Sequence, residues 1–168
     1  MDLWIMRHGA AVSRDDPNGP PDPQRPLTEE GMDKTRAAAQ GLVALGLRPE
    51  RILSSPYVRA RQTAELASQV LGAGLAAVES TDALLGGSAP RELFEVLAEQ
   101  DAQAVLCCGH APHLDQVIAY ALRAADTVTR LKKAGAAHLA LDGLGPPLGV
   151  LAGLYPPRVL RTLGQGKG

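Results

Sequence analysis

The sequence predicts an α/β three-layer sandwich with a mostly parallel central sheet and an antiparallel hairpin in its C-terminal part. Short apolar segments alternate with segments of helical character along most of the 168 residues, an order typical of α/β domains. The run Ala104–Cys108 has no polar alternation, as expected for a central parallel strand. Two later apolar segments, 136–141 and 149–154, flank a turn rich in glycine and proline and therefore predict the hairpin.

Composition limits the kinds of protein that this chain can be. The formal net charge is −1 and aromatic residues make up 3%, which argues against a surface for nucleic acid or anionic membrane. The two cysteines are adjacent, so we expect neither a disulfide nor a zinc signature. The sequence shows no signal peptide and no membrane-spanning stretch. We expect a cytoplasmic monomer with one domain over residues 1–163 and a disordered tail over 164–168.

The apolar run Leu3–Met6 ends abruptly at Arg7, His8 and Gly9. Such a run predicts a buried strand whose carboxyl end presents an arginine and a histidine, and ligands bind at that edge of open α/β sheets. Arg7 offers a planar fork for phosphate oxygens, and His8 can act as nucleophile, base or metal ligand. Gly9 would let the chain turn and keep bulk away from a ligand. Taken alone, the tripeptide is also compatible with a solvated strand end.

Residues 10–26 contain five prolines and predict neither a helix nor an interior strand. Loops of this length often cover binding sites, and a mobile surface excursion is the alternative. Arg25 precedes Pro26, which biases it to an extended backbone. From there its side chain can reach back over His8.

A second strand is expected between two helices. The first helix follows Thr28 as its N-cap, and the strand covers Arg51–Ser54. Ser55 as N-cap and Pro56 in the first helical position predict the start of the next helix. Arg59 lies in its first turn, so a second arginine comes near the carboxyl end of a strand, where a helix N-terminus favours an anion.

The next part of the chain repeats this alternation. Residues 75–78 are expected to form a third strand, and residues 80–90 a loop that contains Asp82. A helix begins at Pro90, and Glu92 lies near its start.

The strand Ala104–Cys108 leads through one glycine to His110, which places a second histidine at the carboxyl end of a strand. Pro112 begins a helix with His113 in its first turn, where the side chain either lines a pocket or serves packing. Residues 155–160, after the hairpin, are expected to form a capping tail.

The order of these motifs resembles the histidine phosphatase superfamily, which has the phosphoglycerate mutase-like fold. The matching segments are Arg7-His8-Gly9, Ser55-Pro56-Tyr57-Val58-Arg59-Ala60-Arg61-Gln62-Thr63 and Gly109-His110. The agreement extends from Met1 to about Leu122. The short chain, the Ile5-Met6 start and the segment Arg25–Thr28 are most similar to the SixA-type phosphohistidine phosphatases.

This resemblance implies a phosphatase that needs no metal or other cofactor. His8 would attack phosphorus as a neutral imidazole and form a covalent phosphohistidine. Arg7 and Arg59 would neutralise the equatorial oxygens, and His110 would donate hydrogen bonds to them, more strongly when charged. The residues expected to bind substrate are Arg25, Gly9 and His113.

The general acid is the part of this chemistry that the sequence does not supply clearly. The candidates, Asp82 and Glu92, fall in no matching motif. An alkoxide leaving group benefits from an acid by roughly 10²–10⁴ in rate, whereas a phosphorylated imidazole can be protonated on its own ring. We therefore expect the substrate to be a histidine-phosphorylated protein, such as a phosphotransfer or carrier domain, and the product to be phosphate.

Several alternatives stay open from the sequence. A general small-molecule phosphomonoesterase of the same superfamily would place Asp82 or Glu92 near a bound phosphate. A mutase would also need a bisphosphate pocket, of which the sequence shows no sign. A non-catalytic phosphate-binding module would have a misplaced nucleophile. Docking on a partner through the proline-rich loop is compatible with catalysis.

Overall fold

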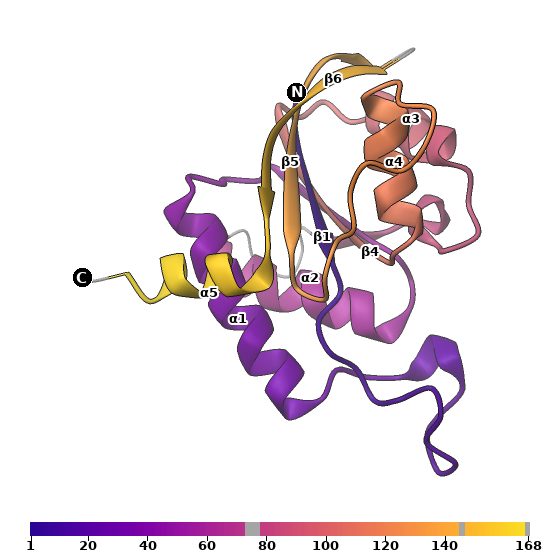
Figure 1. The fold of residues 1–168 in the computed structure, drawn as a ribbon, viewed down its shortest axis with the longest axis vertical. Coiled ribbons are helices and arrows are strands. Elements are labelled where there is room, and N and C mark those ends of the chain that lie inside the picture. The colour runs from indigo at the N-terminus through magenta and orange to yellow at the C-terminus, as the bar shows by residue number, and fades with distance from the viewer. Residues whose placement is uncertain (73–77, 145–146, 167–168) are drawn as a thin grey trace.

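The computed structural model describes residues 1–72, 78–144 and 147–166. Over these ranges six strands form one sheet, and helices cover both of its faces (Figure 1). The strands are β1 (Asp2–Arg7), β2 (Arg51–Ser54), β3 (Val78–Ser80), β4 (Ala104–Gly109), β5 (Ala136–Leu144) and β6 (Pro147–Tyr155). The helices are α1 (Glu29–Ala44), α2 (Val58–Leu71), α3 (Pro90–Ala98), α4 (His113–Ala121) and α5 (Pro157–Gly164), with short 3-10 turns η1 (Asp22–Gln24) and η3 (Asp82–Leu84).

The sheet is parallel except at its C-terminal hairpin. In the described ranges the strand order is β3-β2-β4-β1-β5-β6. β1 pairs in parallel with β4, and β2 pairs in parallel with both β4 and β3. β5 runs antiparallel to β1 and to β6. The predicted α/β sandwich with a mostly parallel sheet and an antiparallel hairpin is therefore confirmed.

Alternate side chains of β1 enter two separate cores. Leu3 and Ile5 pack with residues of α3 and α4, whereas Trp4 and Met6 pack with residues of α1, α2 and α5 on the other face. The adjacent cysteines of β4 divide between the two cores in the same way and are fully buried. Both faces of the sheet are thus covered, as parallel strands require.

The helices that follow β1 and β4 lie on opposite faces of the sheet. The chain leaving β1 leads to α1 on one face, and the chain leaving β4 leads to α4 on the other (Figure 1). Arg7 lies opposite Gly109 in the ladder that joins these strands. His8 and His110 therefore emerge side by side at the carboxyl ends, the position at which open α/β sheets bind ligands.

The helix after β2 begins later than the sequence predicts. Tyr57 is the N-cap residue of α2, and Val58 is its first helical residue, so Pro56 lies in the preceding turn. Ser55 Oγ accepts the N–H of Tyr57 at 3.4 Å in the turn before the helix and also lies 2.9 Å from His110 Nε2. Ser55 is therefore two residues before the N-cap position that the sequence predicted for it.

The third strand and the C-terminal segment also differ from the expectations. The strand lies at Val78–Ser80, because Val78 pairs with Ile52 of β2. The rest of the predicted third strand lies in residues 73–77, outside the described residues. Residues 155–160 are no tail, because they end β6 and begin α5, whose Leu160 is fully buried in the core beside α1.

The domain and tail boundary stays a prediction. Gly164 is the last residue of α5, and residues 167–168 lie outside the described part of the chain. Among the described helices, none is both long and apolar enough to cross a membrane.

Candidate active site

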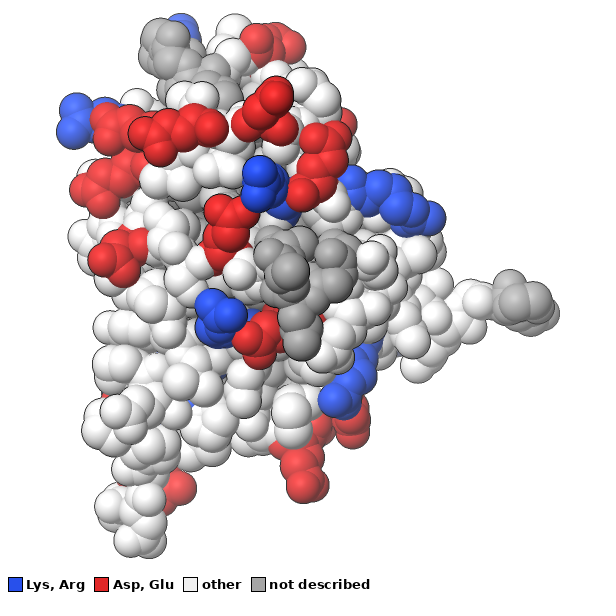
Figure 2. Space-filling model, turned by 180° about the vertical axis from the view of Figure 1, so that it is seen from behind, with Lys and Arg blue, Asp and Glu red and all other residues white. Residues whose placement is uncertain are grey.

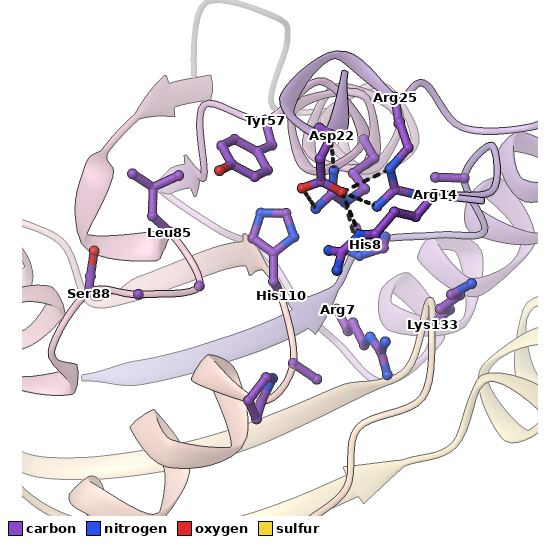
Figure 3. Close-up of a pocket in the computed structure, with 16 residues that line it drawn as sticks. Arg7, His8, Arg14, Asp22, Arg25, Tyr57, Leu85, Ser88, His110 and Lys133 are labelled. Atoms are coloured by element: carbon purple, nitrogen blue, oxygen red, sulfur yellow. Dashed lines mark hydrogen bonds and ion pairs between the residues drawn. The ribbon is translucent and has the colours of Figure 1, made fainter. Parts of the chain in front are cut away.

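A cavity of about 640 Å³ opens where β1 and β4 end, and Figure 3 shows the side chains that line it. Five cationic side chains line this pocket: Arg7, Arg14, Arg25, Arg59 and Lys133. On the face seen in Figure 2 the Lys and Arg side chains are spread out among acidic and uncharged ones. The clustering of cations at the pocket is therefore a local feature of a chain with a net charge of −1, and it favours an anionic ligand.

His8 lies in this pocket as a buried, neutral imidazole. Its Nδ1 is 2.7 Å from the carbonyl oxygen of Gly9, and the Arg59 Nε–H points at its Nε2 over 3.3 Å. Nδ1 therefore carries the proton and Nε2 carries the lone pair. Burial lowers the pKa of His8 to about 4, and the charges of Arg59, Arg7 and Lys133 act in the same direction, against the hydrogen bond to Gly9. Neutral Nε2 is the form of histidine that acts as a nucleophile.

His110 is the second histidine of the pocket, and its ring centroid lies 5.1 Å from that of His8. Ser55 Oγ accepts the backbone N–H of Tyr57 and lies 2.9 Å from His110 Nε2. When Ser55 donates to this nitrogen, the ring proton of His110 is on Nδ1. Burial lowers the pKa of His110 to about 3, helped by His8 and Arg59. His110 is therefore uncharged in the free pocket near neutral pH.

Two buried nitrogens of the pocket residues lack a partner. Within the described chain neither Arg7 Nε nor His110 Nδ1 has a hydrogen-bond partner, although both are buried. Arg7 Nη1 donates to the carbonyl oxygen of Leu131 at 2.8 Å. Buried donors are normally satisfied, so an exception at a cavity calls for an explanation. An oxyanion with several acceptor oxygens would satisfy both donors, and this observation fits a phosphoryl group.

The proline-rich loop supplies the remaining charges of the pocket. Asp22 in η1 binds three arginines: Oδ1 accepts from Arg25 Nε at 2.9 Å and Nη2 at 2.6 Å and from Arg14 Nε at 3.2 Å, and Oδ2 lies 3.3 Å from Arg59 Nη2. Arg25 Nη1 is also held by the carbonyl of Val12 at 2.6 Å. The predicted reach of Arg25 into the pocket is thus present. Closure of residues 10–26 over a substrate stays a prediction.

Asp22 is a carboxylate that the sequence reasoning missed. Burial raises its pKa, but the hydrogen bond from Arg25 and the charges of Arg59, Arg25 and Arg14 outweigh this effect and lower the pKa to about 2. Asp22 is therefore ionised near neutral pH and cannot donate a proton. The one sequence signal was its spacing, three residues before Arg25 in a short turn.

Gly9 plays a different part from the one expected. It does not line the pocket, and a Cβ at this position would lie 2.3 Å from Thr35 Oγ1 on α1. Glycine is therefore required for close packing rather than for access by a ligand. The Gly9 N–H donates to Thr63 Oγ1 at 3.0 Å, and its carbonyl holds His8. Gly9 thus orients the imidazole, and the predicted contact of Gly9 with substrate stays a prediction.

His113 and the two candidate acids lie outside the pocket. His113 is fully buried and its Nε2 is 2.9 Å from the carbonyl oxygen of Ala83 in η3, so it packs in the core instead of binding substrate. Asp82 and Glu92 are exposed at the starts of η3 and α3 and do not line the cavity. The structure therefore brings together Arg7, His8, Arg25, Arg59 and His110, and leaves Gly9, His113, Asp82 and Glu92 aside.

Tyr57 also lines the pocket. It lies in the matching segment Ser55–Thr63, but the sequence predicted no role for it. Its ring meets the ring of His110 edge-on, with centroids 5.2 Å apart. The guanidinium carbon of Arg59 lies 5.0 Å from the centroid of the Tyr57 ring. These two contacts fix the aromatic ring at the margin of the pocket.

A brace formed by residues 129–134 holds Arg7 and His8 from outside the pocket. Asp115 on α4 is 4% exposed, and its Oδ1 accepts from Thr129 Oγ1 at 2.8 Å and from the backbone N–H of Leu131 at 2.9 Å. Leu131 in turn accepts the hydrogen bond from Arg7. Asp115 thus acts on Arg7 through the brace, and no sequence motif indicated it.

The brace also contacts the backbone of the catalytic candidates. The N–H of Ala134 is shared between the carbonyl oxygens of Arg7 at 3.0 Å and His8 at 3.2 Å. Ala134 adopts a φ of 58°, a left-handed conformation that is costly for a residue with a Cβ. Lys133, the residue before it, lines the pocket.

Comparisons with known proteins agree with this arrangement. The family model of the histidine phosphatase superfamily (branch 1) matches residues 3–85. An uncharacterised protein of Picosynechococcus sp. is 43% identical over 143 residues, which cover 80% of this chain and 82% of the relative. The phosphohistidine phosphatase SixA of Escherichia coli is 42% identical over 65 residues, which cover 39% of this chain and 38% of the relative.

A solved structure extends the similarity over nearly the whole chain. The protein histidine phosphatase SixA, complexed with tungstate, superimposes with a TM-score of 0.81 at 26% sequence identity. The match covers 94% of this chain and 98% of that one.

The histidine pKa values predict a loss of stability in mild acid. A histidine in the unfolded chain takes up a proton near pH 6.5, whereas burial and the nearby cations keep His8 neutral down to about pH 4. The unfolded state therefore binds more protons between these values, and the free energy of unfolding falls as the pH drops through this window. We expect ¹⁵N NMR to show a neutral His8 ring at about pH 5, with the signal assigned by its loss in His8→Asn. A midpoint near the unperturbed value would contradict the burial effect.

Asp22→Asn tests whether the Asp22 carboxylate competes with bound phosphate for the arginines of the pocket. Asparagine keeps an oxygen for Arg25 but removes a negative charge from the pocket. We expect inorganic phosphate to bind tighter by roughly an order of magnitude, measured by isothermal titration calorimetry. Asp16→Asn, an exposed loop carboxylate outside the pocket, is the matched control and should change little. Weaker binding in Asp22→Asn would mean that Asp22 chiefly positions the arginines.

Asp115→Ala tests the brace. Removal of the carboxylate leaves the Leu131 N–H buried without an acceptor, which should lower the free energy of unfolding by about 1–3 kcal/mol. It should also weaken phosphate binding roughly tenfold, because Arg7 loses its support. Asp115→Asn keeps the acceptor oxygen and should recover most of the phosphate affinity. Lower stability with unchanged phosphate affinity would limit Asp115 to a structural role.

Proposed function

Because the chain belongs to the histidine phosphatase superfamily and is of the SixA type, we propose that it removes the phosphoryl group from a histidine-phosphorylated protein through a covalent intermediate on His8. The observation that carries this proposal is the state of His8. The ring is buried and neutral, its Nδ1 proton is held by Gly9, and its Nε2 lone pair lies among arginines. A nucleophile in this state attacks a phosphoryl group at neutral pH without prior loss of a proton.

The reaction has two steps. His8 Nε2 attacks phosphorus, the P–N bond of the substrate breaks, and the substrate imidazole leaves with the proton that its ring already carries. Water then attacks the phosphohistidine, which releases inorganic phosphate and restores neutral His8. Arg7 and Arg59 neutralise the equatorial oxygens, and the His110 Nδ1–H donates to one of them.

The charges in the pocket support phosphohistidine over an alkyl phosphate monoester. Asp22 is the carboxylate among the described pocket residues, and arginines lower its pKa to about 2. Asp82 and Glu92 do not line the cavity. An alkoxide would have to leave without a general acid, whereas a protonated imidazole needs none. Independence from metal ions, a cytoplasmic location and a monomeric state stay predictions.

His8→Ala is the test of this function. We expect the wild-type chain to remove phosphate from a histidine-phosphorylated carrier protein faster than from a small alkyl phosphate. His8→Ala should lower the rate on the carrier by at least about 10³-fold. Rapid quenching of the wild-type reaction with ³²P-labelled carrier in alkaline denaturant, which preserves the P–N bond, should trap label on this chain, and His8→Ala should trap none.

His138→Asn is the matched control, because this histidine lies on β5 outside the pocket and should leave the rate unchanged. Turnover of the alkyl phosphate but not of the carrier would indicate that the substrate is a small metabolite. Full activity of His8→Ala on the carrier would refute the covalent mechanism. Phosphate binding without turnover of either substrate would indicate that the chain is a non-catalytic phosphate-binding module.

A further inference from the structure

The side chains that line the pocket fall into two groups. Figure 3 shows Arg7, Arg25 and Lys133 with His8 on one side of His110, and Tyr57, Leu85 and Ser88 on the other. We define the neutral wall as the second group together with the two glycines between Leu85 and Ser88. Its members are Tyr57, Leu85, Gly86, Gly87 and Ser88.

The neutral wall presents no cation to a ligand. Leu85 and Tyr57 are half-buried and offer apolar and aromatic surface. The Ser88 hydroxyl donates to the carbonyl oxygen of Asp82 at 2.6 Å, so its proton is already used. The cationic side chains labelled in Figure 3 lie on the other side of His110, and the remaining one, Arg59, lies against the Tyr57 ring with its guanidinium held by Asp22. A negative charge placed against the neutral wall would lose water and gain no partner there.

The geometry of phosphoryl transfer connects the neutral wall to the leaving group. In-line attack by His8 puts the leaving group on the far side of phosphorus, and the neutral wall lies across the pocket from His8 (Figure 3). We propose that the neutral wall is a leaving-group subsite that accepts an uncharged or cationic ring and rejects leaving groups that carry a negative charge. This inference rests on the proposed function, because it takes His8 as the nucleophile.

Tyr57 gives this subsite its preference for a ring. Its own ring is fixed by the contacts with His110 and Arg59 and needs no rearrangement to receive a planar group. A planar imidazole can pack against this ring through its apolar surface, and this contact needs no charge on the imidazole. The subsite therefore fits the imidazole of a phosphohistidine.

The two glycines open the neutral wall toward solvent. Gly86 and Gly87 are exposed, and a Cβ built at either position meets no heavy atom within 4 Å. The space beside them leaves room for the polypeptide that carries a phosphorylated side chain. It also provides a position for a new side chain, because neither glycine has the positive φ that other residues avoid.

A matched pair of aryl phosphates tests the selection by charge. Phenyl phosphate and 4-carboxyphenyl phosphate share a ring and differ by one carboxylate, which also makes the second a better leaving group. We expect kcat/KM of the wild-type chain to be roughly tenfold higher for phenyl phosphate. This preference would be the opposite of the one that leaving-group ability alone gives. Gly87→Lys should reduce or reverse the preference, whereas Gly87→Gln, similar in length but uncharged, should keep it. Equal ratios for the two variants would overturn the inference.

Tyr57→Leu tests the selection of a ring. Phosphoramidate, which loses ammonia, has no ring for the subsite to hold. We expect Tyr57→Leu to lower kcat/KM on phenyl phosphate several-fold more than on phosphoramidate, and Tyr57→Phe to restore it. Equal losses on both substrates would mean that Tyr57 acts through His110 and not on the leaving group.

The same measurements separate failure of the inference from failure of the proposed function. Turnover of phosphoramidate and the phosphorylated carrier, with no effect of Gly87→Lys or Tyr57→Leu on substrate ratios, would refute the subsite alone. Selective turnover of phenyl phosphate, with no activity on the carrier or phosphoramidate, would refute the phosphohistidine substrate and keep the subsite.

Discussion

Repulsion among the cations of one pocket is the constraint on which the rest of the site depends. Four arginines and a lysine line a cavity whose walls also hold two buried histidines. Such a cluster persists only if other groups hold each cation in place. Asp22 binds three of the arginines, while the carbonyl groups of Val12 and Leu131 hold Arg25 and Arg7. Burial, together with the remaining positive potential, keeps His8 neutral, and two buried nitrogens, Arg7 Nε and His110 Nδ1, stay without a partner among the described residues.

The sheet topology solves a second problem, which is to bring distant residues to that cluster. β1 and β4 are neighbours, although about a hundred residues separate them in the chain, and their register sets Arg7 opposite Gly109. α2 begins just beyond β2 and carries Arg59 to the same edge. The glycine after His8 permits close contact with α1, and Thr63 of α2 binds its N–H. Arg7 and Arg59 therefore lie on a strand and a helix, and His8 and His110 directly follow the ends of two neighbouring strands.

The sequence predicted those features that depend on local patterns. The strands of the parallel sheet, the Thr28 cap and the hairpin follow from apolar runs and turn residues, and Arg7, His8, Arg59 and His110 follow from their places at strand ends. The start of α2 was wrong by two residues, because Ser55 lies in the turn before the helix, where its hydroxyl contacts the Tyr57 N–H and the His110 ring.

Features that depend on tertiary contacts escaped prediction. Asp22 belongs to a proline-rich loop without periodicity, and Asp115 acts through a segment without regular secondary structure. Gly9 was assigned to the substrate because nothing in the sequence reveals that Thr35 of α1 lies beside it. His113 shows the same limit, because its position in the first turn of α4 does not reveal which way its ring faces.

The contact between Asp22 and the arginines has a consequence for turnover. A pocket built to bind a dianion tightly risks retaining the inorganic phosphate that a phosphatase produces. Asp22 supplies a tethered carboxylate that competes for Arg25 and Arg59 at a fixed high local concentration. As phosphate departs, this carboxylate would be in place to pair again with the guanidinium groups before water has to solvate them alone. We therefore expect the loop to act as a built-in counter-ion that shortens the residence time of the product.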